Sequence, residues 1–241
     1  MNTPLSSSRC WIDLETASIT PEVARAVADR VFRGDFHEPG FCVVAFPQST
    51  GSVTLRGLMV ALKEALSNLY ERRFGDPLEY VSMGRFDQQN TTRLHLDGAP
   101  VRSFLMLGYE PTTVPSEFQI ADYSRCAADL GLTPQKFLAA HNPMMSGQAE
   151  LLEGHLTLLR DWQELQPRVV VVNNCSTAPG DPCHTPGVLH GARILAPDSR
   201  ATRVINSTMT VPRSLAADTA LPPDVVKAFV HTEEIAGEIR R

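Results

Sequence analysis

The residues that most directly suggest chemistry are a histidine and an aspartate two positions apart. His95 and Asp97 occur in the segment RLHLDG, residues 93–98. On an extended strand, residues i and i+2 project from the same face, so both side chains can reach one metal ion. Two histidines and one carboxylate can hold Fe(II) on one face and leave the other coordination positions open, as non-heme oxygenases require. The pair therefore predicts an iron site if a second histidine joins it.

His190 is the best candidate for the second histidine. It lies in the strand-like segment TPGVLHGARIL (185–195), with Gly187 and Gly191 close by. Four other histidines fit less well, because they fall in predicted helical or turn segments: His141, His155, His184 and His231, the last in the His-x-Glu triple 231–233 of a predicted C-terminal helix.

An arginine could supply the cation that a carboxylate co-substrate needs. Arg203 opens the strand-like run RVINSTMTV, 13 residues after His190. A guanidinium in this place can pair with a carboxylate through two parallel hydrogen bonds. Arg200, ten residues after His190, is the competing candidate.

The elements that must position these residues begin with two helices and a strand. Thr20 can cap a helix that has Pro21 at its first position and ends before Gly34. GFCVVAFP (40–47) is typical of a buried strand, and a second helix is expected at about 52–75. We therefore place the N-terminal helices at about 20–75.

From residue 78 the pattern changes to short strand-like runs separated by turn residues. Several short strands without long helices between them indicate an antiparallel sandwich or barrel. We expect this β-barrel core at about 78–212, with a partly helical insertion at about 124–166 and an amphipathic helix at about 223–240. The sequence thus predicts one domain over 1–241, mainly β with flanking helices (α+β).

Composition excludes several other classes of protein. With 43% hydrophobic and 20% charged residues, the chain has the composition of a protein that folds. Its net charge is −5, and its sequence contains no long run of basic residues. We therefore expect no nucleic-acid or membrane partner. Without a leader-like or membrane-spanning run, a cytoplasmic location is expected. Five cysteines, an odd number, argue against a secreted disulfide framework, and Cys175, Cys183 and His184 fit no common zinc spacing.

A series of segments, in this order, adds a likeness to a known family: GFCVVAF, RRFGDP, HLDGAP, ADYSRCAADL, and VLHGARI followed by SRATRVIN. Over about residues 22–212 the chain resembles the Fe(II)/2-oxoglutarate-dependent dioxygenases, most closely the branch of taurine dioxygenase and clavaminate synthase. The resemblance implies a double-stranded β-helix, or jelly-roll barrel. It implies that His95, Asp97 and His190 hold iron and that Arg203 binds the distal carboxylate of 2-oxoglutarate.

One departure from the family concerns the co-substrate. Members often carry a Gly-Gly-acidic-Thr stretch whose threonine helps to hold 2-oxoglutarate, whereas this chain reads VPSEFQIADY, with Phe118 at or near that threonine. Ser103 or Ser207 could supply the missing hydroxyl.

The resemblance implies an enzyme that hydroxylates, or otherwise oxidises, an unactivated C–H bond of a small molecule. O2 is consumed, and 2-oxoglutarate is decarboxylated to succinate and CO2. Candidate substrate contacts lie in the first barrel strand: Arg85, Gln89 and Arg93. Arginines there would favour an acidic or amino-acid-like substrate. Two alternatives remain open: a non-catalytic β-helix binding module, and a cupin-like metalloenzyme that does not use 2-oxoglutarate.

Overall fold

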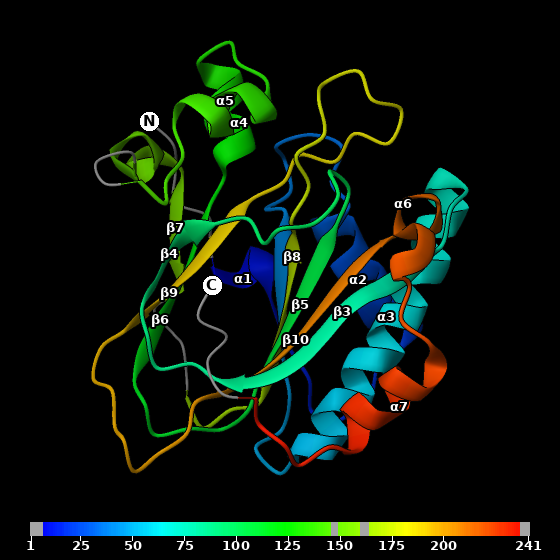
Figure 1. The fold of residues 1–241 in the computed structure, drawn as a ribbon, viewed down its shortest axis with the longest axis vertical. Coiled ribbons are helices and arrows are strands. Elements are labelled where there is room, and N and C mark those ends of the chain that lie inside the picture. Colours follow the sequence, from blue (N-terminus) through cyan, green and yellow to red (C-terminus); the bar gives the residue numbers. More distant parts are fainter. Residues whose placement is uncertain (1–6, 146–148, 160–163, 237–241) are drawn as a thin grey trace.

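Two β-sheets face each other in the computed structural model, and helices cover the outer face of the larger one (Figure 1). The structure describes residues 7–145, 149–159 and 164–236. The larger sheet has six strands in the order β1 (Trp11–Asp13), β2 (Phe41–Ala45), β8 (Arg168–Asn173), β5 (Phe104–Tyr109), β10 (Val204–Pro212) and β3 (Leu78–Asp87). The smaller sheet has four strands in the order β4 (Thr92–His95), β9 (Leu189–Ile194), β6 (Ser116–Ala121) and β7 (Leu156–Leu159).

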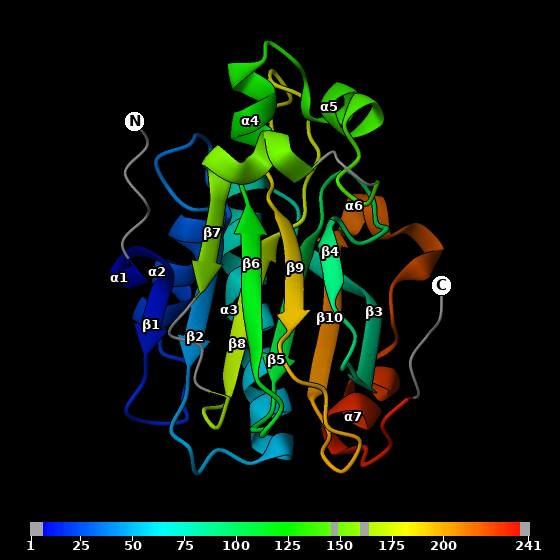
Figure 2. The same cartoon turned by 90° about the vertical axis from the view of Figure 1, so that its left-hand side faces the viewer.

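All strand pairs are antiparallel except β1 with β2, which is parallel. Figure 2 shows the smaller sheet lying in front of the larger one. The described residues include no strand ladder that joins the two sheets. The prediction of a mainly β protein with flanking helices is confirmed, while the two sheets do not form a closed barrel.

The apolar run of β8 shows why the larger sheet lies in the middle of the molecule. Val170 and Val172 pack in the core between the sheets, whereas Val169 and Val171 pack in the core under the helices. A strand buried on both faces carries apolar residues without alternation. Phe118 on β6 completes the core between the sheets from the other side.

The two long helices begin and end where the sequence predicts. In α2 (Pro21–Val31), the Thr20 hydroxyl accepts the N–H of Val23 at 3.3 Å. α3 (Ser52–Phe74) ends at Gly75, whose φ of 74° lies in the left-handed region that glycine adopts without strain. The remaining helices are short: α1 (Ser7–Cys10), α4 (Tyr123–Asp129), α5 (Pro134–Ala140), η1 (Ala149–His155), α6 (Arg213–Ala216), η2 (Ala217–Thr219) and α7 (Pro223–His231).

Two predicted boundaries need correction. The insertion at 124–166 contains α4, α5 and η1, but it also contributes β7, which pairs with β6 as the edge strand of the smaller sheet. The C-terminal helix ends at His231, and the N–H of Ala236 donates to the carbonyl of Arg85 at 2.8 Å. Residues 237–240 of the predicted helix lie outside the described residues. No helix in the described part of the chain has the length and apolar character of a membrane span.

Candidate metal centre

The structure brings His95, Asp97 and His190 together at one end of the smaller sheet. His95 is the last residue of β4, and His190 lies directly opposite it on β9. Asp97 follows two residues beyond the end of β4. Its carboxylate oxygens lie 3.3 Å from Nε2 of His95 and 3.9 Å from Nε2 of His190. One ligand atom from each residue lies within 4.8 Å of the others, so these side chains can bind one iron ion.

A glycine lets β4 approach β9 closely enough for the two histidines to meet. Gly191 follows His190, so it faces the opposite side of the sheet. A Cβ at Gly191 would lie 2.9 Å from the carbonyl oxygen of Thr92 and 3.1 Å from the carbonyl carbon of Arg93. Any larger residue would push β4 away, and with it His95.

The site is closed on one side and open on the other. His190 is 5% exposed, and its ring stacks on Phe118, with centroids 6.4 Å apart and an interplanar angle of 21°. The side chains of His95 and Asp97 are 22% and 36% exposed. Phe118 therefore packs against one of the three candidate ligands, and access to the site is from the side of the other two.

Burial, hydrogen bonds and nearby charges shift the pKa values of the two histidines in opposite directions. Burial lowers the pKa of His95, but hydrogen bonds to Asp97 and to the Arg93 carbonyl outweigh burial, and its pKa is raised. That carbonyl lies 2.8 Å from Nδ1 of His95, which leaves Nε2 to face the carboxylate. Burial, together with the nearby His95, lowers the pKa of His190, so its ring is neutral near pH 7. Nε2 of His190 faces the Asp97 carboxylate, whereas its buried Nδ1 has no hydrogen-bond partner among the described residues.

Arg203 lies between the sheets, immediately before β10. It is 1% exposed, its Nε donates to the Ser116 hydroxyl at 3.2 Å, and its guanidinium lies 5.1 Å from the ring centroid of Tyr109. No carboxylate of the described residues forms an ion pair with it. A buried guanidinium without an anionic partner is a candidate anion site, because burial makes an uncompensated charge costly.

Tyr109 contacts both this guanidinium and Phe118, whose ring centroid lies 5.9 Å from that of Tyr109. Burial raises the pKa of Tyr109 to about 12, Arg203 opposes the rise, and Asp97 is close enough to add to it. The phenol therefore lies within the electrostatic reach of both Arg203 and Asp97. Tyr109 was not among the predicted site residues, although strand alternation with Leu105 and Leu107 predicts that it faces inward.

The other predicted co-substrate residues lie in different surroundings. Arg200 has a side chain that is 87% exposed and pairs with Asp198. Ser207 is half-buried and shares the inward face of β10 with Arg203, because the two positions differ by an even number. Ser103 is fully buried, and its hydroxyl is hydrogen bonded to Asn174.

The three residues predicted to contact the substrate also lie in different surroundings. Arg85 lies on the helix-covered face of the larger sheet, where it pairs with Glu110 at 3.1 Å, so the structure does not bring it to the triad. The side-chain amide of Gln89 donates to the Ala201 carbonyl and accepts from the Asp198 N–H, so it holds the loop before β10. Arg93 is exposed beside His95, and it donates to the carbonyl of Met144 at 2.6 Å.

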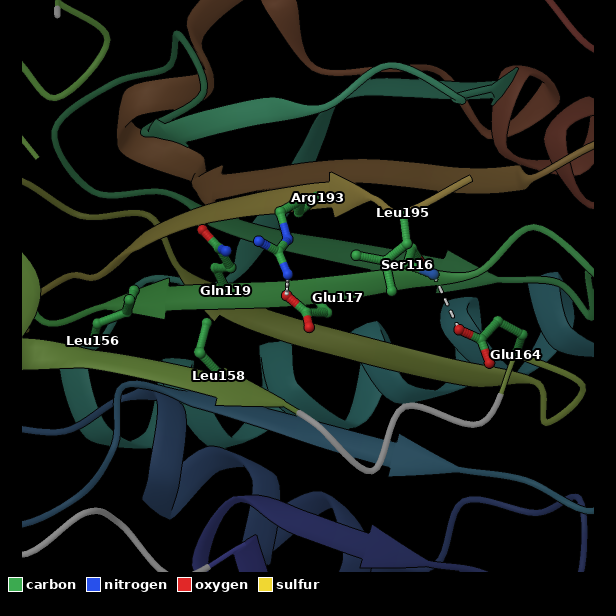
Figure 3. Close-up of a pocket in the computed structure, with 8 residues that line it drawn as sticks. All are labelled: Ser116, Glu117, Gln119, Leu156, Leu158, Glu164, Arg193 and Leu195. Carbon is green, nitrogen blue, oxygen red and sulfur yellow. Dashed lines mark hydrogen bonds and ion pairs between the residues drawn. The ribbon is translucent and has the colours of Figure 1, made fainter. Parts of the chain in front are cut away.

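A hollow of about 470 Å³ lies elsewhere, on the outer face of the smaller sheet (Figure 3). Arg193 and Glu117 form an ion pair across it at 2.9 Å. Strand alternation places both on the face opposite His190 and Phe118, so this hollow does not lead to the candidate metal centre. Its lining residues come from or adjoin β6, β7 and β9: Ser116, Glu117, Gln119, Leu156, Leu158, Glu164, Arg193 and Leu195.

No protein-family model and no curated protein matches the chain. Among solved structures, it is similar to HygX from Streptomyces hygroscopicus with iron bound, at 10% identity and a TM-score of 0.34, over 82% of this chain and 81% of HygX. It is also similar to the iron- and alpha-ketoglutarate-dependent endoperoxidase NvfI, at 13% identity and a TM-score of 0.34, over 78% of this chain and 81% of NvfI. TM-scores of this size establish neither a shared fold nor a shared function, so the iron site is inferred from His95, Asp97 and His190 alone.

Proposed function

We propose that the protein is an Fe(II)- and 2-oxoglutarate-dependent oxygenase with a double-stranded β-helix fold, related to taurine dioxygenase and clavaminate synthase. One observation carries the proposal: His95, Asp97 and His190 converge on one point and leave one side open. A buried guanidinium between the same two sheets supports it. Two histidines and a carboxylate are the ligand set that keeps free positions for a bidentate co-substrate and for O2.

Each residue would have a distinct role. His95, Asp97 and His190 would hold the metal, and Arg203 would pair with the distal carboxylate of 2-oxoglutarate. Tyr109 and Ser116, which adjoin the guanidinium, would line the same pocket. Phe118 would exclude water from the buried side of His190. A bound Fe(II) ion would supply O2 activation coupled to the decarboxylation of 2-oxoglutarate, with the protein fixing the position of the reactants.

The substrate would be a small molecule that approaches from the exposed side of His95 and Asp97. Of the three arginine and glutamine candidates, Arg93 is the one beside these ligands, and its charge would favour an acidic or amino-acid-like substrate. Oxidation of an unactivated C–H bond, with hydroxylation as the simplest outcome, follows from this proposal.

Calorimetric titration of the Mn(II)-loaded protein with 2-oxoglutarate tests the proposal without requiring the substrate. We expect binding to the metal-loaded wild type, and none to the apoprotein or to His190→Ala. A metal-loaded wild type that does not bind 2-oxoglutarate would indicate the cupin-like alternative. A folded wild type that binds no Mn(II) would indicate the binding-module alternative.

A further inference from the structure

The backbone of Asp97 lies outside the strand ladder that fixes the other two metal ligands. His95 and His190 are held as a cross-strand pair, and this is the last pair between β4 and β9. Asp97 follows after the strand has ended. The direction of its carboxylate therefore depends on a different support, because side-chain direction follows from the backbone.

Asn174 provides this support. Its Oδ1 accepts the backbone N–H of Asp97 at 3.0 Å, and its Nδ2 donates to the backbone carbonyl of Asp97, also at 3.0 Å. A side-chain amide offers the same donor and acceptor as a peptide group. The amide of Asn174 thus takes the place that a neighbouring strand would have.

Asn174 is itself held firmly. It follows directly after β8, is 3% exposed, and its Nδ2 also donates to the hydroxyl of Ser103 at 3.0 Å. That hydroxyl donates to the backbone carbonyl of Asn174 at 3.3 Å. Asn174 therefore connects Asp97 to the larger sheet, whereas His95 and His190 belong to the smaller sheet.

We propose that Asn174 is a positioning residue for the metal centre, and that its amide, oriented by Ser103, sets the direction of the Asp97 carboxylate. The inference rests on the metal site of the proposed function. It also gives Ser103 a role different from contact with 2-oxoglutarate. Hydrogen-bond partners of ligating side chains contribute about 10- to 100-fold to metal affinity, and we expect a loss of similar size when the backbone of Asp97 loses the partner that directs its carboxylate.

Co(II) binding to the full chain tests this proposal, with affinity measured by calorimetry and ligand geometry by visible absorption. The variants are Asn174→Ala, Ser103→Ala and a matched control, Asn206→Ala. Asn206 is also a buried asparagine that donates to a backbone carbonyl, that of Gly108, but it faces the helices. We expect Asn174→Ala to bind Co(II) about 10- to 100-fold more weakly, with an altered spectrum. The control should lower the Tm and leave affinity and spectrum unchanged.

Two results would overturn the proposal. One is wild-type Co(II) affinity in folded Asn174→Ala; the other is an equal loss in Asn206→Ala. Should Asn174→Ala not fold, Ser103→Ala decides. We expect it to weaken Co(II) binding about 2- to 10-fold, the effect of one hydrogen bond, and unchanged affinity would contradict the proposal. A wild type that binds no Co(II) refutes the metal site itself, a different outcome from all of these.

Discussion

His95 and His190 face each other across β4 and β9, with ring centroids 4.3 Å apart and ring planes inclined by 43°. The pairing register, together with Gly191, brings together two residues that are far apart in the sequence. Because the ladder is built from backbone hydrogen bonds, it is the pairing of the strands that places the two histidines opposite each other. The histidines can therefore be replaced without removing the support of the sheet.

His95→Ala should abolish metal binding and leave the fold intact. Its side chain is partly exposed, so little packing is lost, while one of three ligands disappears. Calorimetry with Mn(II) and circular dichroism measure the two effects. His231→Ala is the control, since His231 belongs to a similar His-x-Glu triple at the exposed end of α7. Loss of stability in His95→Ala without loss of metal affinity would show that His95 has only a core role.

Arg203→Lys should weaken 2-oxoglutarate binding to the metal-loaded protein by about 2 kcal/mol or more, roughly 30-fold, because lysine keeps the charge but not the paired hydrogen bonds. Arg200→Ala should change the affinity less than twofold, since its side chain is 87% exposed. Calorimetry on both variants measures the difference. The reverse ranking would assign the carboxylate to Arg200.

Gly191→Ala should weaken metal binding at least about tenfold, because the added Cβ pushes β4, and His95 with it, away from β9. Gly57→Ala is the matched control: its Cβ meets nothing within 4 Å, and it lies inside α3. The control should keep wild-type affinity and gain about 0.5–1 kcal/mol of stability. Tight metal binding in Gly191→Ala would show that the close approach of the strands is not needed.

Glu110→Gln should destabilise the protein by about 3 kcal/mol near pH 7, because it leaves the buried Arg56 and Arg85 side by side without a carboxylate. Burial raises the pKa of Glu110, but hydrogen bonds from Arg85, Ser52 and Asn206 outweigh burial and lower its pKa below 4.5. The contribution of Glu110 is therefore complete above pH 4.5 and is lost as the pH falls through the lower folded-state pKa.

Urea unfolding of wild type and Glu110→Gln at a series of pH values measures this effect. The difference in the free energy of unfolding should narrow steadily below pH 4.5. A difference that stays constant down to the acid transition would mean that the charge of Glu110 contributes nothing.

The elements with local signals could be predicted from the sequence. The ends of the long helices are marked by Thr20, Pro21 and Gly75. Each of these residues acts on the backbone next to it, through a capping hydrogen bond or its own conformational preference. β7 was missed because its four residues, LTLL, follow a helical segment and owe their conformation to pairing with β6. The C-terminal helix was predicted too long, because the chain leaves the helix after His231 and Ala236 forms a β-bridge with Phe86 of β3.

In the candidate site too, some residues could be predicted from the sequence and others could not. His95, Asp97 and His190 could be selected from residue type and order, and the structure brings them together. The roles of Arg85 and Asn174 could not be predicted from the sequence, because they depend on partners that are distant in the sequence. Arg85 pairs with Glu110 through the larger sheet, and nothing in VVVVNN tells which asparagine reaches Asp97.

Anaerobic titration of the apoprotein with Fe(II) and then with 2-oxoglutarate tests the central claim most directly. The measurement is the weak visible charge-transfer band of the chelate, on wild type, His95→Ala and Arg203→Lys. We predict a band that requires both additions, is absent in His95→Ala and needs more 2-oxoglutarate in Arg203→Lys. A folded wild type that gives no band after both additions would contradict the account.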